Sequence, residues 1–194
     1  MPAFWSTIFG NDHPVEVEIG CGTGTFILAA AARWPRTNFF GIERSHSRAA
    51  QVQAGIEARA AHNARVIAAD AVCVVSTLIP PASVAAYHIY FPDPWWKRRH
   101  QRRRLFTPAF ATMLDRTLLA DGRIHVATDV GDLFALALRT LNACASLARE
   151  PASISPRMEH TTFERKSRAR GAAILEATFT KYRLPQIRSR VPQA

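Results

Sequence analysis

The chain has 194 residues, 48% hydrophobic and 21% charged, and this ordinary composition predicts one globular domain and excludes two comfortable ones. Its formal net charge is +10, and residues 97–104 and 151–194 each carry a net +6. Two local basic patches indicate a polyanionic partner, whereas a membrane-binding face would need a long apolar stripe that neither patch has.

The cysteines and the first residues bear on the compartment. Cys21, Cys73 and Cys144 are scattered and odd in number, which favours free thiols in a reducing compartment over a disulfide framework or a zinc site. The N-terminus lacks a charged leader with a cleavage signal, and no apolar run approaches membrane-spanning length. We therefore expect a cytoplasmic protein with no metal and no membrane contact.

Strands and helices are predicted to alternate from residue 15 onward. The expected strands lie at 15–19, 38–43, 65–69, 84–91 and 123–128, with a closing strand at 173–182. The first expected helix follows the glycine loop and ends at about residue 33, and the second lies at 45–61. A short helix follows Asp70 and ends at residue 78, another begins at Thr107, and the last lies at 131–143. This pattern predicts an α/β fold with a Rossmann-like, doubly wound, mostly parallel sheet and helices on both faces. We expect a short N-terminal segment (1–14), one domain (15–183) and a basic, disordered tail (184–194).

The first expected strand ends in a glycine loop with three glycines, Gly20, Gly22 and Gly24. Their spacing is one residue short of the pattern that places a pyrophosphate on a helix N-terminus. Glu18 belongs to a strand that should be buried, where an unpaired carboxylate is costly and a cationic ligand would compensate it. S-adenosyl-L-methionine, which has a sulfonium, an ammonium and no phosphate, fits this loop better than a dinucleotide.

Two more acids end the next two strands. Glu43 can accept hydrogen bonds from both hydroxyls of a ribose, and Asp70 can accept one from the exocyclic amine of adenine. Either acid alone can equally be a helix N-cap or a solvated strand end. Because Glu18, Glu43 and Asp70 all lie at the carboxyl ends of consecutive strands, we expect them to share a cofactor site.

Residues 90–104, YFPDPWWKRRHQRRR, form the most distinctive stretch. The prolines are expected to hold Phe91 and Asp93 extended, so that Asp93 follows a buried strand on a stiff loop. The basic run is either a solvated face or a phosphate-binding surface, and its neighbours, a carboxylate and two tryptophans, favour a nucleic-acid site. Trp95 or Trp96 can stack on an extruded base or pack beneath the loop.

The motifs VEVEIGCGTG, FFGIE, AADA, FPDPW and ATD together resemble a class I S-adenosyl-L-methionine-dependent methyltransferase. FPDPWWKRRHQRRR and TTFERK resemble, more narrowly, the bacterial tRNA (guanine-N7-)-methyltransferases, which modify a guanine in the variable loop of tRNA. The resemblance covers residues 15–181. Trp96 stands where that family more often has His, and Val130 where it more often has Trp.

The resemblance implies roles for particular residues. It assigns cofactor contacts to Glu18, Glu43, Asp70 and Asp93, with Asp93 also the catalytic residue. From the loop itself we expect Gly20, Gly22 and Gly24 to contact the cofactor as well. It assigns substrate contacts to Lys97, Asp129, Thr161, Thr162, Phe163 and Glu164, and RNA contacts to Arg99, His100, Gln101, Arg102, Arg103 and Arg104.

Some of these residues have competing interpretations. Asp129 binds substrate or caps the following helix, and Glu164 holds the base or pairs with a cation such as Arg165. His88, inside an apolar strand, is predicted to be a satisfied core histidine.

The expected partner is tRNA, and the expected activity is transfer of a methyl group to guanine N7. Guanine N7 has an unprotonated lone pair, so Asp93 is expected to position the base and to balance charge rather than to remove a proton. The alternatives are a methyltransferase acting elsewhere on RNA or on a small molecule, an inactive RNA-binding paralogue, and a nucleotide-dependent dehydrogenase.

Overall fold

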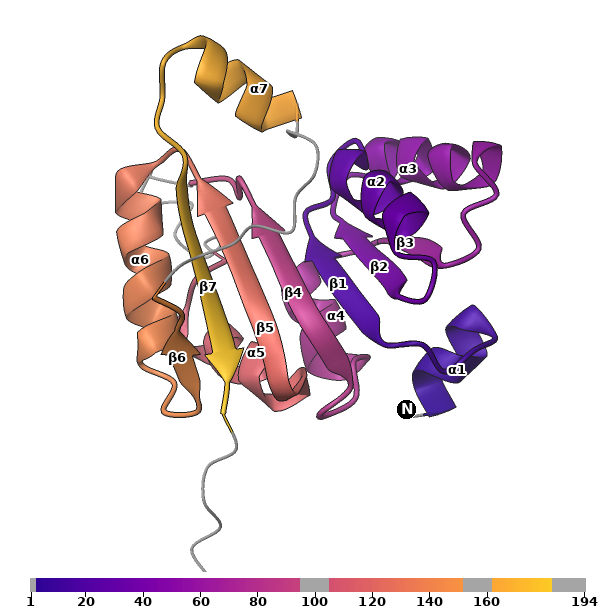
Figure 1. Ribbon diagram of the computed structural model, residues 1–194, viewed down its shortest axis with the longest axis horizontal. Coiled ribbons are helices and arrows are strands. Elements are labelled where there is room, and N and C mark those ends of the chain that lie inside the picture. The colour runs from indigo at the N-terminus through magenta and orange to yellow at the C-terminus, as the bar shows by residue number, and fades with distance from the viewer. Residues whose placement is uncertain (1–2, 95–104, 152–161, 183–194) are drawn as a thin grey trace, which may run out of the picture.

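A seven-stranded sheet runs through the centre of the computed structural model, which describes residues 3–94, 105–151 and 162–182 (Figure 1). The strand order is β3-β2-β1-β4-β5-β7-β6, and β1 to β5 pair in parallel while β7 is antiparallel to both neighbours. The strands are β1 (Val15–Ile19), β2 (Asn38–Glu43), β3 (Ala64–Ala68), β4 (Val84–Tyr90), β5 (Leu118–Thr128), β6 (Leu147–Arg149) and β7 (Leu175–Lys181). The predicted mostly parallel, doubly wound sheet is confirmed.

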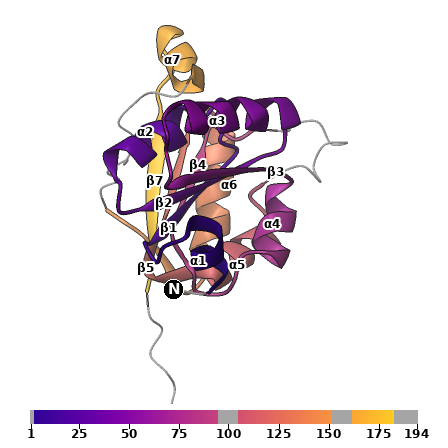
Figure 2. The same cartoon turned by 90° about the vertical axis from the view of Figure 1, so that its right-hand side faces the viewer.

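Helices cover both faces of the sheet (Figures 1 and 2). Two of them, α2 (Thr25–Arg33) and α3 (His46–Ala58), lie against β1, β2 and β3 on one face. The other face is covered by α4 (Ala71–Thr77), α5 (Pro108–Thr117) and α6 (Gly131–Asn142). The seventh helix, α7 (Thr162–Ala169), lies beyond the carboxyl ends of β4 and β5 in both views.

The alternation in β1 divides the two hydrophobic cores. Val15, Val17 and Ile19 pack into the larger core with the α4, α5 and α6 face, while Glu16 and Glu18 point to the opposite face. Strand β2 is buried along its whole length, as expected for a central parallel strand. Glu18 is therefore enclosed, as its position in the sequence predicted.

Three helices begin at polar residues that cap them. Ser45 accepts a hydrogen bond from the amide of Arg48, Asp70 from Val72 and Cys73, and Thr107 from Phe110. These caps fix where α3, α4 and α5 leave the sheet edge. In the described parts of the chain, no helix is both long and apolar enough to cross a membrane.

The fold differs from the sequence prediction at the ends of the chain. A helix, α1 (Ala3–Phe9), lies in the N-terminal segment 1–14, for which no helix was predicted. Its Trp5 is fully buried and packs against Phe40. The short strand β6 and the helix α7 were not predicted. Strand β5 begins at Leu118, five residues before the prediction, because an irregularity at Asp121 and Gly122 lets the chain pair with β4 on both sides of it.

The turn after β4 also differs from expectation. Phe91 has φ of +50°, in the left-handed region, so the prediction that Pro92 holds it extended was wrong. Its amide donates to the carbonyl of Ala127 at 2.8 Å, and its ring packs against the smaller core. These tertiary contacts outweigh the local preference and turn the chain sharply toward Asp93.

Candidate functional site

A pocket at the carboxyl edge of the sheet brings together four acids from four consecutive parallel strands. Glu18 belongs to β1, Glu43 to β2, Asp70 follows β3, and Asp93 follows β4, and all four line this one pocket. It lies where the strand order reverses between β1 and β4, the place at which open α/β sheets bind their ligands. The expected grouping of the acids is thus seen, while their contacts with ligands remain predictions.

The glycine loop lines the pocket in a conformation that suits glycine. Gly22 has φ of +56° and donates its amide to Glu43 Oε2 at 2.9 Å. Gly24 has φ of +81°, and a Cβ there would lie 3.1 Å from the side chain of Val52. Gly20 and Gly22 therefore bring bare backbone up to the pocket, whereas Gly24 does not line it and is needed for close packing against Val52.

Glu43 holds this loop against the end of β2. It is buried, and its two carboxylate oxygens accept hydrogen bonds from the amides of Gly22 and Ser45, both at 2.9 Å. Each oxygen has a second lone pair, so a hydroxyl in the pocket can still donate to either one. Glu43 thus has a structural role in addition to the ligand contact predicted for it.

Glu18 is the least satisfied acid of the pocket. It is 5% exposed, and its Oε2 has no hydrogen-bond partner among the described residues. Burial raises the pKa of this carboxyl to about 8; the Ile27 amide opposes the shift and the negative charge of Glu43 adds to it. A cationic group placed in the pocket would relieve this burial cost.

Asp70 acts as a helix cap and also lines the pocket. One carboxylate oxygen accepts hydrogen bonds from the amides of Val72 at 3.0 Å and Cys73 at 3.2 Å. The N-cap interpretation is confirmed. The contact with adenine remains a prediction. The second carboxylate oxygen of Asp70 takes no part in the cap and could accept that hydrogen bond.

Asp93 follows β4, is exposed, and lines the pocket together with Gly20 and Gly22 of the glycine loop. Phe91 and Pro92 line the same wall, so the sharp turn after β4 sets the direction of this carboxylate.

His88 supports that wall from below. Its ring nitrogens lie 2.7 Å from Glu16 Oε2 and 2.9 Å from the hydroxyl of Tyr90, whose side chain lines the pocket. His88 is buried and also stacks on His125, with ring centroids 5.2 Å apart. It is a satisfied core histidine, as predicted.

Helix α7 is tied to the sheet edge by ionic contacts. The hydroxyl of Ser167 donates to the carboxylate of Asp129, and Arg170 lies 3.7 Å from the same carboxylate. The N-cap residue of helix α6 is Val130, whose amide donates a hydrogen bond to the hydroxyl of Thr128. Among the described residues, no side chain, that of Asp129 included, caps this helix. The capping alternative for Asp129 was therefore wrong.

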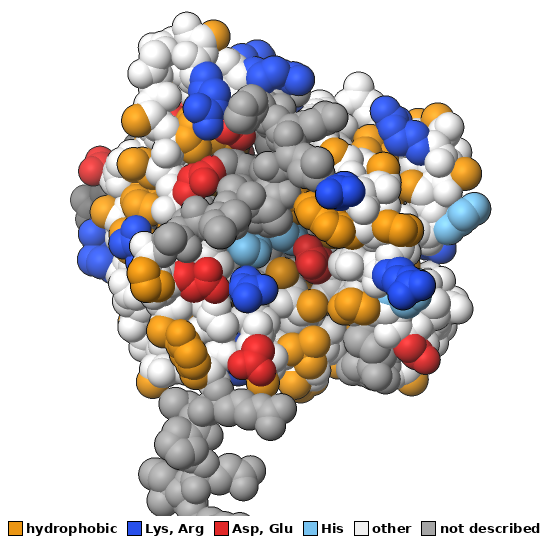
Figure 3. All heavy atoms as spheres, in the orientation of Figure 1, with side chains coloured by type: hydrophobic (Ala, Val, Ile, Leu, Met, Phe, Trp, Pro, Cys, Tyr) orange, Lys and Arg blue, Asp and Glu red, His pale blue; other side chains and the backbone are white. Residues whose placement is uncertain are grey.

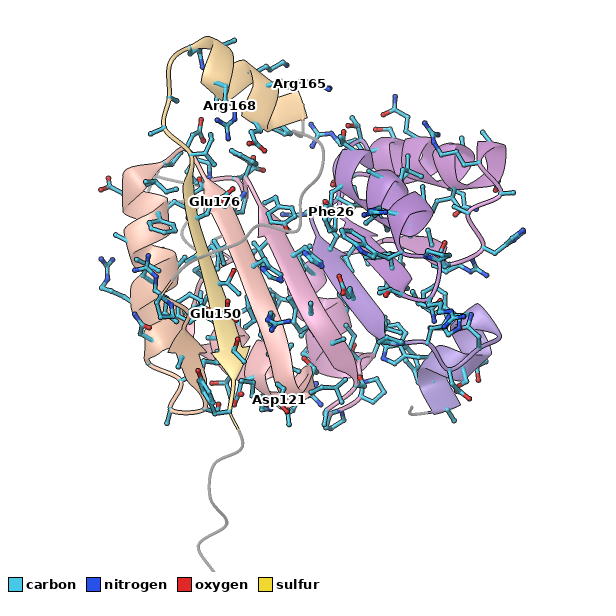
Figure 4. All side chains as sticks on the ribbon, viewed as in Figure 1. Phe26, Asp121, Glu150, Arg165, Arg168 and Glu176 are labelled. Carbon is cyan, nitrogen blue, oxygen red and sulfur yellow. The ribbon has the colours of Figure 1, made fainter. Side chains whose placement is uncertain are left out.

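Glu164 is buried within α7 rather than exposed. It is 1% exposed and pairs with Arg168 at 2.9 Å, one helical turn away. The predicted pairing with a cation is therefore confirmed, but the partner among the described residues is Arg168 and not the suggested Arg165. The i,i+4 spacing explains the choice, since adjacent residues on a helix point in different directions. In Figure 4 Arg168 lies on the side of α7 toward the strand ends.

Phe163, half exposed, brings α7 to the pocket that the four acids line. Several predicted site residues lie outside the described residues, so the structure gives their roles no test. These are Trp95, Trp96, Lys97, Arg99, His100, Gln101, Arg102, Arg103, Arg104 and Thr161, and of Thr162 only the backbone, at the start of α7, is described.

The sequence prediction missed two cations at the pocket. Arg44 and Arg48 line it and are exposed. A signal existed, because Arg44 directly follows the acid that ends β2 and Arg48 follows one helical turn later. The sequence analysis of residues 43–48 considered only the carboxylate of Glu43 and not these two arginines.

Comparison with known proteins yields one matching family and many named relatives. The family model described as "Putative methyltransferase" matches residues 12–177. A tRNA (guanine-N(7)-)-methyltransferase of Rhodopirellula baltica is 36% identical over 189 residues, covering 90% of this chain and 69% of that protein. Proteins of the same name from Treponema pallidum (strain Nichols) and Klebsiella pneumoniae are 39% and 34% identical, covering 87% and 93% of this chain and 67% and 77% of theirs.

Solved structures share the fold at low sequence identity. The 16S rRNA methyltransferase KamB superposes with a TM-score of 0.67 at 14% identity, covering 94% of each chain. The aminoglycoside resistance methyltransferase NpmB1 superposes with a TM-score of 0.63 at 17% identity, covering 91% of each chain. These likenesses establish a methyltransferase type of Rossmann-like architecture and nothing about substrate.

Proposed function

The chain belongs to the bacterial tRNA (guanine-N7-)-methyltransferase family, and we propose that it transfers a methyl group from S-adenosyl-L-methionine to N7 of a variable-loop guanine in tRNA. The observation that carries the proposal is the gathering of Glu18, Glu43, Asp70 and Asp93 in one pocket. Such a pocket suits a cationic adenine cofactor on one side and a guanine on the other. A dinucleotide would instead bring a pyrophosphate close to four carboxylates.

The residues of the pocket fit the cofactor that the family implies. When bound, S-adenosyl-L-methionine supplies a methyl group on a sulfonium and an ammonium besides. Glu18, with a buried oxygen that lacks a hydrogen-bond partner among the described residues, would hold the ammonium. Glu43 would accept from the ribose hydroxyls and Asp70 from the adenine amine, while the glycine loop leaves room for close approach.

Asp93 would hold the guanine on the other side of the pocket. Its two oxygens can accept hydrogen bonds from guanine N1–H and N2–H₂, which leaves N7 free to attack. Because N7 carries no proton, no general base is needed, and the carboxylate serves to orient the base and to offset the positive charge that develops on the purine. Its exposed position at the pocket is compatible with a substrate that arrives from solvent.

The substrate side would be completed from two other segments. Phe163 brings an exposed aromatic ring to the pocket, where it can pack against the base. We propose that Lys97, Thr161, Thr162 and Glu164 contact the same nucleotide, and that residues 99–104 bind RNA phosphates. Asp129, held by Ser167, would position α7 rather than touch the base directly.

The test is incubation of the purified protein with unmodified tRNA and methyl-labelled cofactor, followed by digestion and identification of the labelled nucleoside. We expect N7-methylguanosine at one variable-loop position. Label in another nucleoside would indicate a different RNA target. Tight tRNA binding with no label in any nucleoside would indicate an RNA-binding paralogue that has lost the activity.

A further inference from the structure

We infer that two pairs of cations form phosphate-binding rims that face each other across the mouth of the pocket. One rim is Arg44 and Arg48 beside α3, and the other is Arg165 and Lys166 on α7. The inference rests on the proposed function and names the surface that receives the RNA backbone on either side of the target base. Neither pair belongs to the basic run at 97–104.

The α3 rim lies directly on the pocket. Arg44 and Arg48 both line it and both are exposed. Neither guanidinium forms an ion pair within the part of the chain that the structure describes. Two arginines thus line a pocket with four acids without an ion-pair partner among the described residues.

The dipole of helix α3 adds to the positive charge around Arg44 and Arg48. Helix α3 begins at His46 and has no acidic residue in its first turn, where Arg48 lies. Cations are disfavoured at a helix N-terminus because the unpaired amides carry partial positive charge. The free protein therefore concentrates positive potential at this rim, and an anion from outside would relieve it.

Helix α7 separates its charges by face. Glu164 and Ser167 are buried, and their contacts engage Arg168 and Asp129 on the inner side. Arg165 and Lys166 are exposed, and neither has an ion-pair partner among the described residues. In Figure 4 Arg165 lies at the end of α7 nearest to α2 and α3, and in Figure 3 Lys and Arg side chains lie over α7 and over that pair of helices.

Geometry connects the two rims through the pocket. Phe163 of α7 lines the same pocket as Arg44 and Arg48. Lys166, three residues later, lies on the neighbouring part of the helix surface, and Arg165 lies at the end of α7 nearest to α2 and α3 (Figure 4). An enzyme that acts on an extruded base must hold the backbone on both sides of it, because the flipped nucleotide is flanked by two phosphate groups. Cations on both sides of the pocket mouth meet this requirement for RNA, whereas a small uncharged substrate would need neither rim.

The experiment compares two double variants, R44A/R48A and R165A/K166A, with the matched control R33A/R36A. The control removes two exposed arginines at and just beyond the C-terminal end of α2, whose N-terminal residues line the pocket, so that net charge falls equally. We measure tRNA affinity by filter binding at several salt concentrations, S-adenosylhomocysteine affinity by calorimetry, and methyl transfer. Circular dichroism checks that each variant folds.

Each rim variant should weaken tRNA binding on the order of ten-fold at about 0.1 M salt and reduce the salt slope by about 0.7 for each phosphate that is no longer bound. The control should change neither, and S-adenosylhomocysteine affinity should be unchanged in the control and in R165A/K166A. In R44A/R48A, whose arginines line the pocket, tRNA affinity should fall by a larger factor than S-adenosylhomocysteine affinity. Rim variants that behave like the control would overturn the inference. Weakened S-adenosylhomocysteine binding with normal tRNA binding would also overturn it, since Arg44 and Arg48 would then serve the cofactor. Because binding and transfer are measured separately, wild-type protein that binds tRNA without methylating it would refute the proposed function and still test the rims.

Discussion

Glu18 shows how far the fold changes a single side chain. The same carboxyl that is ordinary in an unfolded chain is buried here and has its pKa raised from 4.5 to about 8. Between these two values the folded protein retains a proton that the unfolded chain releases. The contribution of Glu18 to folding stability must therefore fall as pH rises from about 4.5 to about 8.

A pH series on the variant Glu18→Gln tests this reasoning. The amide cannot ionise, so the variant should lose this part of the pH dependence, and its free energy of unfolding relative to wild type should increase between about pH 5 and pH 8. Urea unfolding of the cofactor-free protein measures it, with the exposed Glu57→Gln as control. A constant difference between variant and wild type across that range would show that Glu18 is ionised when folded.

The second prediction at this scale concerns Asp93. Asp93→Asn keeps the shape of the side chain, but it loses the charge and presents a donor to the guanine donors. We expect kcat to fall by about 10²–10³, as on removal of a preorganised electrostatic group. S-adenosylhomocysteine affinity and tRNA affinity should be nearly normal because the turn is held by Phe91 and its bond to Ala127. Turnover close to wild type would place the chemistry elsewhere.

Polar contacts join helix α7 to the end of the sheet. Asp129 joins it to the end of β5 through Ser167 and Arg170, and Arg170 is 70% exposed. Exposed ion pairs contribute about 0–1 kcal/mol, so these contacts can orient the helix without adding much global stability.

Asp129→Asn should therefore loosen α7 selectively. We expect hydrogen exchange of residues 163–170 to increase several-fold, with little change in the unfolding temperature, because local opening need not involve the core. The apparent KM for tRNA should rise as well. Asp132→Asn, an exposed acid in the first turn of α6, is the control and should change none of these quantities. Unchanged exchange in α7 after Asp129→Asn would show that other contacts hold the helix.

The elements that the sequence predicted well are those with local signals. Strands β1 and β2 were predicted with their observed bounds because apolar residues mark them and an acid or glycine ends them. The caps of α3, α4 and α5 were readable from Ser45, Asp70 and Thr107 for the same reason.

What the sequence did not predict depends on distant contacts. The left-handed Phe91 is held by Ala127, and α7 is held by Asp129, which lies 38 residues before Ser167. Strand β6 has only three residues and takes its register from β7. The four pocket acids could be grouped in advance because parallel strands share one carboxyl edge. Arg44 and Arg48 were missed although they follow one of these acids directly and at one helical turn, because the prediction weighed only the carboxylate at this strand end.

Over the whole molecule, charges of both signs gather around the pocket, where Glu18 and Glu43 are buried and Asp70 and Asp93 are exposed. Acids line the pocket, while the cations around it, Arg44 and Arg48 near α3 and Arg165 and Lys166 on α7, are exposed. The four pocket acids suit a cationic cofactor and the charge that develops on a methylated purine, and the exposed cations around them suit a polyanion. The topology places this arrangement between β1 and β4, where the strand order reverses.

Transfer to guanine N7 can be tested at a single atom with a tRNA in which the target guanosine is replaced by 7-deazaguanosine. This base keeps the edge that Asp93 would bind and replaces only N7 by a carbon that has no lone pair. We expect single-turnover methylation of the guanosine tRNA, no transfer to the 7-deaza tRNA, and similar affinity for both. Equal methyl incorporation into the two RNAs would contradict the proposed function, since the accepting atom could not then be N7.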